Sequence, residues 1–575
     1  MKIMKFFTLS SLLLLWVTML WAVPAQRVRR TVTLEDGTSV VITLRGDEHY
    51  SWWQTDKGQV VEPSVYNPGR YVYSQETLDE VTQTAQRRYM AAVKGARRIG
   101  SQATAPLPAI GSPKVPVVLV NFTDSVFTVA DTDEGIRQYY DLFCNGTRDG
   151  NLYRGHGSYG AIRDYFVQQS DSLFLPEFVI IGPVTLDHPE SYYGENGSGK
   201  DKQKDKKYSQ FRNDAIAKAT AIYEGDWKDF DNRGKSSDKQ VQVDMVFFIF
   251  AGYGEANGGD ASTIWPKEST SSVTINDILF STSACCNEKH MAFDREKEMY
   301  YNAPDGIGIM CHELSHALGL PDFYDTNYKA FGMDIWSLMD YGCHASGGTC
   351  PVAYTAYERD FMGWRKLVPL NEWGFYSIAP IAAGGIGYKI VNDENPNEFY
   401  VLENRQRVEW DRALGYYGHG MQVTHVDYQA SSWNNNSVNT DVNHQRMTII
   451  AANNLYDGTS NDDVTAERLY ETWSGNAYPY KNGTIFNDSL TANSVPAATV
   501  YTKSGFMNKD INFIREHDDN TVSFYFGNDY YTSVQDLSFS PKNVDNGIFD
   551  LSGRRLLMVP RKGLYLRGGR KWLVR

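Results

Sequence analysis

The chain has 575 residues, and 42% of them are hydrophobic, which is an ordinary content for a globular protein. This length predicts three or four domains rather than one. The formal net charge of -13 argues against a nucleic-acid partner, and no basic stretch interleaved with aromatic residues opposes that exclusion.

Residues 1–25 have the pattern of a signal peptide. Two lysines precede an apolar stretch over residues 6–21, and Ala22 or Ala25 supplies the small residue that signal peptidase requires. No later run of about 18 apolar residues occurs, so we expect no transmembrane anchor after signal removal. The pattern predicts a secreted or bacterial cell-surface protein, in which disulfides are permitted.

The next part of the chain predicts strands, one helix and a linker. Short strand patterns separated by turns fill residues 26–105 and lead into a helical pattern over 78–93. A run over 104–116 is rich in Pro, Ala and Gly, which is typical of an exposed linker. Continuous apolar runs at 115–122 and 243–255 then predict two buried strands, the second ending in glycines.

The motif HELSHALGLPD carries the clearest chemistry. On a helix, His312 and His316 lie on one face one turn apart, so both imidazoles reach the same ion. Glu313 lies beside the first ligand, where it can accept a proton from water. A left-handed Gly319 ends the helix and turns Asp322 back under the histidines. The motif therefore predicts a zinc site of two His and one Asp, with an open position for water.

Two details around this motif are predicted less directly. Asp305 follows a proline and is the expected N-cap of the zinc helix. Asp325, three residues beyond Asp322, is the rival candidate for the third ligand.

The extended motif is followed by a second element, Trp336-Ser-Leu-Met-Asp-Tyr341, and together they resemble a metzincin. With Phe331-Gly-Met and Cys350-Pro, they most resemble the immune inhibitor A family of secreted metallopeptidases. The resemblance implies that Met339 is the apolar floor under the zinc. It also implies that Tyr341 ligates the resting ion or stabilises the oxyanion of the tetrahedral intermediate. The alternative is that both are ordinary core residues of a turn.

The resemblance also implies a domain order. Residues 26–105 correspond to a pro-segment, removed near the basic pair Arg97-Arg98, and residues 106–368 to a metzincin-like catalytic domain. Asp47 is either a latency device that occupies the open zinc position or part of a polar hairpin turn. In metzincin-like enzymes a strand above the cleft binds extended substrates by its edge. We assign this edge to the end of the second apolar run, at Ala251, Gly252, Tyr253 and Gly254.

Candidates for other metal sites and for a disulfide are weaker. The loop at Asp229 resembles the start of a family calcium loop, but Arg233 and Lys235 interrupt its acidic run. Their positive charge opposes a divalent ion, which argues against Ca²⁺ at the Asp229 loop and leaves calcium elsewhere open. Cys343 and Cys350 flank a short loop and are close enough in sequence to pair.

Residues 369–530 show alternating strand patterns, and the resemblance implies a β-sandwich there. His419, His425 and His444 are irregularly spaced, which favours structural roles over a second metal site. Residues 531–575 alternate apolar and basic residues and resemble the C-terminal sorting signals of type IX secretion. That resemblance would make outer-membrane secretion machinery a partner. The alternative is an edge hairpin of the preceding domain.

The sequence thus predicts an α+β protein with a pro-segment, a metzincin-like zinc peptidase domain and a C-terminal β-sandwich. The expected function is a secreted zinc endopeptidase that hydrolyses polypeptide substrates through a zinc-activated water, with Glu313 as general base. One rival is a surface adhesin or glycan-binding protein with a relic zinc helix, but a ligand set alone does not need Glu313. The other is a zinc hydrolase of non-peptide amides or peptidoglycan, which a substrate-binding edge strand disfavours.

Overall fold

The computed structural model describes residues 20–528, except for 22, 94–99, 198–203, 295–298, 328, 416, 456–472 and 484, and beyond 528 it describes four short strands. The predicted signal peptide lies largely outside the described residues. Within them, no helix combines the length and the apolar character that crossing a bilayer requires.

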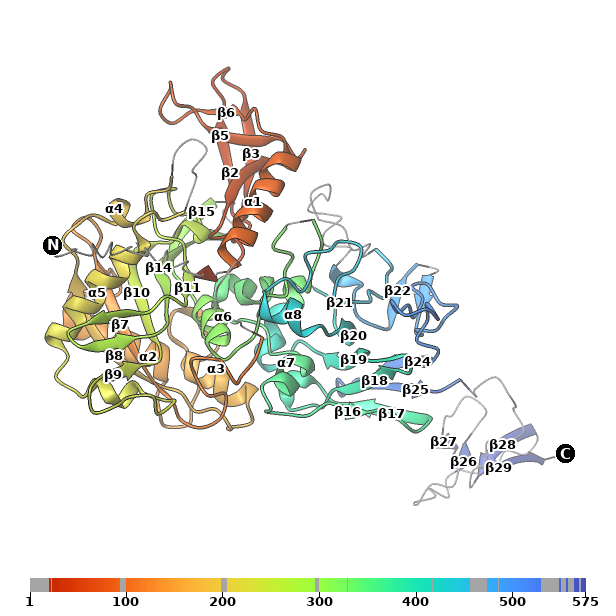
Figure 1. Ribbon diagram of the computed structural model, residues 1–575. Helices are drawn as coiled ribbons and strands as arrows, with labels where there is room; N and C mark the ends of the chain where they lie inside the picture. The colour runs from red at the N-terminus through yellow and green to blue at the C-terminus, as the bar shows by residue number, and fades with distance from the viewer. Residues whose placement is uncertain are drawn as a thin grey trace, which may run out of the picture.

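A seven-stranded sheet is the centre of the fold (Figure 1), in the order β1-β11-β14-β10-β7-β8 with β15 beside β14. Four strands run parallel to one another: β7 (Lys114–Asn121), β8 (Glu177–Thr185), β10 (Val246–Tyr253) and β14 (Ser283–Asp294). Three pair antiparallel: β1 (Leu20–Trp21), β11 (Lys267–Ser269) and β15 (Met299–Pro304). The apolar runs of β7 and β10 fit this topology, because parallel strands are buried on both faces.

Helices cover both faces of this sheet. One apolar core joins the sheet to α2 (Asp133–Asn145), α3 (Ile162–Gln169) and α6 (Gly308–Ala317), and a second joins it to α5 (Tyr208–Ile222). Successive residues of β7 divide between the two cores, since side chains alternate along a strand. Val117 and Leu119 belong to the first core, and Val118 and Val120 to the second.

The N-terminal part forms a separate five-stranded sheet, drawn in red in Figure 1. Its strands are β2 (Arg29–Thr33), β3 (Ser39–Gly46), β4 (Ser51–Thr55), β5 (Val60–Pro63) and β6 (Tyr71–Tyr73). Helix α1 (Leu78–Val93) follows, as the pattern predicted, and its Val81 and Ala85 pack against Trp52.

The C-terminal part contains two further sheets that share one apolar core. The first consists of β16 (Val368–Pro369), β18 (Tyr388–Asn392), β19 (Asn395–Arg405), β20 (Gly420–Asp427) and β21 (Met447–Ile449). The second consists of β17 (Gly374–Ile378), β25 (Val522–Phe526) and β24 (Ile511–Glu516). The fold as a whole is therefore of the α+β class.

The remaining α-helices and strands of the described chain are smaller. These are the helices α4 (Glu190–Gly194), α7 (Ala356–Phe361) and α8 (Ala430–Asn434), and the strands β9 (Val241–Val243), β12 (Val273–Ile275), β13 (Ile278–Phe280), β22 (Tyr480–Asn482) and β23 (Ile485–Asn487). The tail forms one small sheet of β26 (Ile548–Phe549), β27 (Arg555–Leu556), β28 (Gly563–Arg567) and β29 (Arg570–Val574).

All six cysteines are buried and free. The expected pairing of Cys343 with Cys350 is therefore absent from the structure. The Cys350 thiol instead donates to the Trp410 carbonyl at 3.5 Å.

Candidate metal centre

The helix that carries the two histidines is entirely buried. It begins at Gly308, later than predicted, because the Asp305 carboxylate accepts hydrogen bonds from the Gly306 N–H (2.9 Å) and the Asn287 amide (3.0 Å) instead of capping the helix. Its end is as predicted, since Gly319 has φ of +104° and turns the chain. Asp322 then lies close to both histidines.

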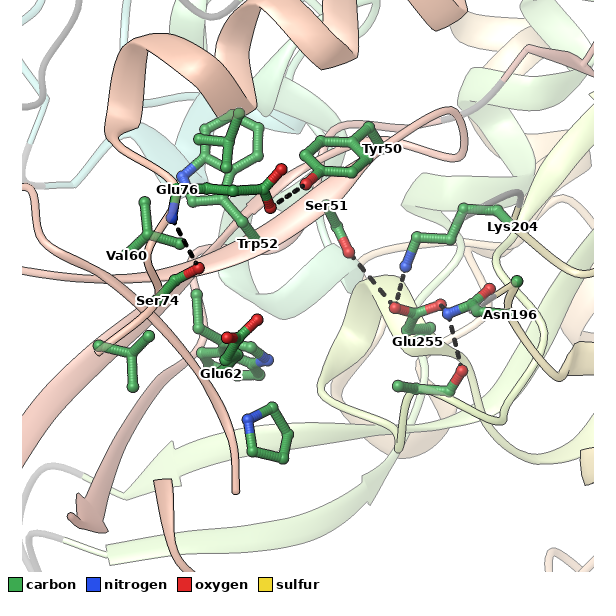
Figure 2. Close-up of a pocket in the computed structure, with 16 residues that line it drawn as sticks. Tyr50, Ser51, Trp52, Val60, Glu62, Ser74, Glu76, Asn196, Lys204 and Glu255 are labelled. Carbon is green, nitrogen blue, oxygen red and sulfur yellow. Dashed lines mark hydrogen bonds and ion pairs between the residues drawn. The ribbon is translucent and has the colours of Figure 1, made fainter. Parts of the chain in front are cut away.

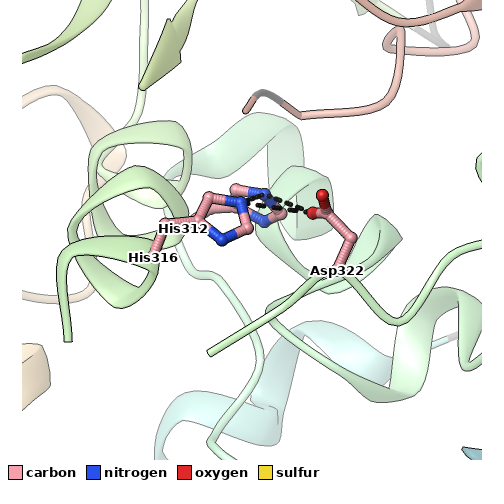
Figure 3. A group of neighbouring side chains, drawn as sticks. All are labelled: His312, His316 and Asp322. Atoms are coloured by element: carbon pink, nitrogen blue, oxygen red, sulfur yellow. Dashed lines mark hydrogen bonds and ion pairs between the residues drawn. The ribbon is translucent and has the colours of Figure 1, made fainter. Parts of the chain in front are cut away.

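Figure 3 shows His312, His316 and Asp322 converging on one point. The two Nε2 atoms are 3.1 Å apart, and Asp322 Oδ1 lies 3.1 Å from His312 Nε2 and 3.3 Å from His316 Nε2. Each Nδ1 is 2.8 Å from a backbone carbonyl, that of Leu338 for His312 and that of Leu320 for His316. These carbonyls fix both rings with Nε2 directed at the common point.

This arrangement fits a bound cation. Because each Nδ1 carries the hydrogen that its carbonyl accepts, the two Nε2 lone pairs face each other and the Asp322 carboxylate. Burial opposes the ionisation of Asp322, yet the two histidines hold its pKa below its ordinary value. Burial alone would lower the pKa of His316, but the charge and hydrogen bond of Asp322, the charge of Glu268 and the hydrogen bond to the Leu320 carbonyl together outweigh burial and raise it. Three donor atoms within 4.8 Å, of types that zinc prefers, therefore favour a metal ion at this point.

The rival ligand Asp325 has a different environment. Its carboxylate accepts main-chain hydrogen bonds from Asn327 (2.8 Å), Lys329 (2.8 Å) and Ala330 (2.7 Å). These hydrogen bonds stabilise the loop that contains Asp325. Asp325 is absent from the metal-type group found among the described residues.

Glu313 lies on the same helix turn and is fully buried. Its Oε1 accepts a hydrogen bond from the Val23 N–H at 3.2 Å, while Oε2 has no hydrogen-bond partner among the residues that the structure describes. Burial raises the pKa of Glu313 well above its usual value, and the charges of Asp322 and Glu48 raise it further. This carboxyl group therefore holds a proton readily in the closed site.

The turn from Ser337 to Tyr341, which we call the Met-turn, lies against the histidines. Its Leu338 carbonyl orients His312, and the Met339 N–H donates to Ser337 Oγ at 3.0 Å. Met339 is fully buried, and its carbonyl accepts from the Phe323 N–H at 2.8 Å, which ties the turn to the loop of Asp322. Tyr341 donates its hydroxyl hydrogen to the Ala25 carbonyl at 2.8 Å.

The segment just before the N-terminal sheet runs through this site. Strand β1 pairs antiparallel with β11, and the Val23 N–H reaches Glu313. The indole of Trp265 donates to the Val23 carbonyl at 3.4 Å, and His344 Nε2 lies 3.0 Å from the Pro24 carbonyl. These contacts cover Glu313 and Tyr341 together.

Asp47 has no such role in the structure. Its Oδ1 accepts hydrogen bonds from the N–H groups of His49 (2.8 Å) and Tyr50 (3.1 Å). This is the polar turn that the sequence offered as the alternative to a latency device.

The predicted substrate-binding edge is corrected by the sheet order. Strand β10 has β14 on one side and β7 on the other, so Ala251, Gly252 and Tyr253 end an interior strand, and Gly254 follows it. The Ala251 carbonyl accepts from Ser125 Oγ (3.2 Å), and the Gly252 N–H donates to Glu288 Oε2 (3.1 Å). At the other end of the sheet β1 is the edge strand, and β11 lies between β1 and β14.

The loop at Asp229 is held by cations and by main-chain hydrogen bonds. Asp229 pairs with Lys114 at 2.9 Å, and Lys235 lies 3.4 Å from Asp244. Asp231 accepts from the N–H groups of Lys235 and Ser236, both at 2.7 Å. Lysines therefore already balance these carboxylates.

The three histidines of the C-terminal part each pair with a different carboxylate. His419 Nδ1 lies 2.5 Å from Glu516, His425 Nε2 lies 2.9 Å from Glu398, and His444 Nε2 lies 2.7 Å from Asp427. None of the three joins a metal-type group among the described residues.

A hollow of about 350 Å³ separates the N-terminal sheet from the central domain (Figure 2). Trp52 and Val60 line one side, and Lys204 and Glu255 form a buried ion pair on the other. Ser51 Oγ donates to Glu255 at 3.3 Å across this boundary. The interface is thus incompletely packed and partly polar.

One contact of the site had no signal in the sequence. Asn436, in the C-terminal part, hydrogen-bonds twice to Asp322, which is 114 residues away. No motif or spacing links the two positions.

Comparisons with known proteins agree with this geometry. Residues 109–367 match the family model of the immune inhibitor A peptidase M6 catalytic domain. Immune inhibitor A of Bacillus thuringiensis subsp. alesti is 25% identical over 293 residues, which cover 45% of this chain and 41% of that protein. The pre-pro-metalloprotease PrtV of Vibrio cholerae serotype O1 is 25% identical over 274 residues, which cover 43% of this chain and 29% of PrtV. The match thus spans less than half of each relative.

Proposed function

Because residues 109–367 belong to an immune inhibitor A-like family of metallopeptidases, we propose that this protein is a secreted zinc endopeptidase that hydrolyses peptide bonds in polypeptides. The observation that carries the proposal is the convergence of His312, His316 and Asp322 with Glu313 beside them. We propose that the first three hold the zinc ion. A bound zinc ion supplies Lewis acidity, which polarises a carbonyl and lowers the pKa of water toward 7.

The side chains around the ion then have distinct roles. Glu313 accepts a proton from water at Oε2 and returns it to the leaving amine, and its raised pKa suits a group that must hold that proton. The Tyr341 hydroxyl now donates its hydrogen bond to the Ala25 carbonyl. Once that carbonyl is removed, the hydroxyl is available to donate to the oxyanion. Met339 provides the buried apolar floor under the ligands.

The N-terminal part is proposed to be a pro-segment, residues 26–105, that keeps the enzyme latent. Within residues 26–105, the Arg27 guanidinium lies 3.8 Å from the centroid of the Tyr341 ring and pairs with Asp334 at 3.2 Å, which supports this proposal, as does the poorly packed interface around Glu255. Strand β1, which pairs with β11, lies within the predicted signal peptide, so removal of residues 1–105 would leave β11 exposed at the cleft. An extended substrate can add to such an edge by main-chain hydrogen bonds, which favours polypeptides over other amides.

The remaining proposals concern the other domains. Residues 106–368 are proposed to be metzincin-like and residues 369–530 to form a β-sandwich, which the shared core of two sheets supports. Residues 531–575 are proposed as a sorting signal for an outer-membrane secretion machinery, which would give a secreted or cell-surface protein.

A substrate screen tests the proposed function. The full-length protein, treated by limited proteolysis to remove the N-terminal part, is assayed against an unfolded protein, peptidoglycan and small non-peptide amides, and its zinc content is measured. We expect about one zinc per chain, cleavage of the unfolded protein alone, and little cleavage before proteolysis. Zinc binding without turnover of any substrate would support a binding protein instead.

A further inference from the structure

The third metal-type ligand is held by a residue from the C-terminal part of the chain. Asn436 Nδ2 donates to Asp322 Oδ2 at 2.5 Å, and the Asp322 N–H donates to Asn436 Oδ1 at 2.6 Å. Both residues are buried. One amide group therefore fixes both the carboxylate and the main chain of Asp322, and the other carboxylate oxygen, Oδ1, is left facing His312 and His316.

The backbone around Asn436 presents this amide in a defined way. Asn436 follows α8 with φ of +52°, the left-handed conformation in which Asn is tolerated better than most residues. Its N–H donates to the Trp433 carbonyl (3.2 Å), and the Ser437 N–H donates to the Ser432 carbonyl (2.8 Å). These two hydrogen bonds form a Schellman motif, so the position of Asn436 is set by the end of the helix.

The helix itself is anchored on the loop of Asp322. Trp433 is fully buried, and its ring packs 6.4 Å from Phe323 and 6.2 Å from Tyr357, between centroids. Further along, the Asn439 amide donates to the Phe323 carbonyl at 2.7 Å, and Gln445 Oε1 accepts from the Gly332 N–H at 2.9 Å. Residues 433–445 thus contact the ligand loop at several points.

We propose that Asn436 is a positioning residue for the metal ligand Asp322, so that residues beyond 368 are part of the metal centre. The proposal rests on the zinc site of the proposed function. A carboxylate with one oxygen fixed by a donor loses rotational freedom, which lowers the entropic cost of directing the other oxygen at an ion. The segment matched to the family model ends at residue 367 and so lacks this group.

The test is the zinc affinity of the full-length protein, measured by competition with a chromogenic chelator. Asn436→Gly removes the amide and keeps the left-handed backbone, since glycine adopts positive φ freely. The matched control is Asn508→Gly, an exposed Asn of the same region with φ of +53°. We expect zinc affinity about 10- to 100-fold weaker for Asn436→Gly, the range typical of lost outer-shell partners, and unchanged for the control.

A second variant distinguishes a loss of zinc affinity from a folding defect. Asn436→Asp keeps the acceptor for the Asp322 N–H but sets a carboxylate oxygen against Asp322 Oδ2, so zinc affinity should again fall at least tenfold. Thermal unfolding of each zinc-free variant is measured beside it, and if Asn436→Gly is unfolded, Asn436→Asp decides. If the wild type binds zinc and the zinc affinity of the folded variants is within threefold of the wild-type value, the role of Asn436 alone is overturned. Absence of zinc binding in the wild type would overturn the proposed function as well.

Discussion

Ionisation of Glu358 should make the stability of the Met-turn depend on pH. This buried carboxyl accepts hydrogen bonds from Ser337 Oγ at 2.6 Å and from the Thr355 N–H at 2.6 Å, so it ties the Met-turn to α7. Burial raises the pKa of Glu358 from 4.5 to about 7, since it outweighs these hydrogen bonds. The unfolded chain loses this proton near pH 4.5 and the folded chain near pH 7, so stability that is present below pH 4.5 is lost as the pH rises through 7.

The size of the effect follows from the two pKa values. At about 1.36 kcal/mol per pKa unit, the full difference corresponds to about 3 kcal/mol, of which about 2 kcal/mol falls between pH 5 and 7.5. Gln cannot ionise, so Glu358→Gln lacks this loss. Between pH 5 and 7.5 the free energy of unfolding of the wild type should therefore fall by about 2 kcal/mol more than that of Glu358→Gln. Urea unfolding at both pH values measures it, with the exposed Glu372→Gln as control. Equal pH dependence of Glu358→Gln and wild type would show that ionisation of Glu358 does not destabilise the folded protein.

Three further predictions concern the site and the tail. Asp322→Ala should weaken zinc binding about 100-fold or more because a direct ligand is lost, whereas Asp325→Ala should keep one zinc per chain, as metal analysis would show; the reverse pattern would exchange the two assignments. Tyr341→Phe should lower kcat of the activated enzyme about 100-fold with little change in KM, because one oxyanion donor is removed, and full turnover would exclude the hydroxyl from the mechanism. Deletion of residues 545–575 should move the protein from the medium or cell surface to the periplasm in fractionation experiments, and an unchanged location would contradict the sorting role.

The parts of the site that depend on local geometry could be predicted from the sequence. The i, i+4 spacing of the histidines and the left-handed Gly319 are set by helix periodicity and by a single backbone angle. These two features suffice to bring Asp322 to the histidines, and the structure has this arrangement.

The parts that depend on distant contacts could not be predicted. Val23 reaches Glu313 across 290 residues and Asn436 reaches Asp322 across 114, and no local pattern encodes either contact. The wrong prediction of a substrate-binding edge at β10 has a different cause. Its unbroken apolar run from Val246 to Ala251 is itself a sign of an interior strand, whereas an edge strand alternates or carries charges.

The most direct test of the central claim is hydrolysis of an unfolded protein by the activated enzyme and by its Glu313→Ala variant, each with and without a zinc chelator. If Glu313 and zinc act as proposed, only the wild type is active, its activity is lost on chelation and restored by zinc, and the variant binds zinc with wild-type stoichiometry but is about 100- to 10,000-fold slower. Full activity of Glu313→Ala, or wild-type activity that survives the removal of all zinc, would contradict this mechanism.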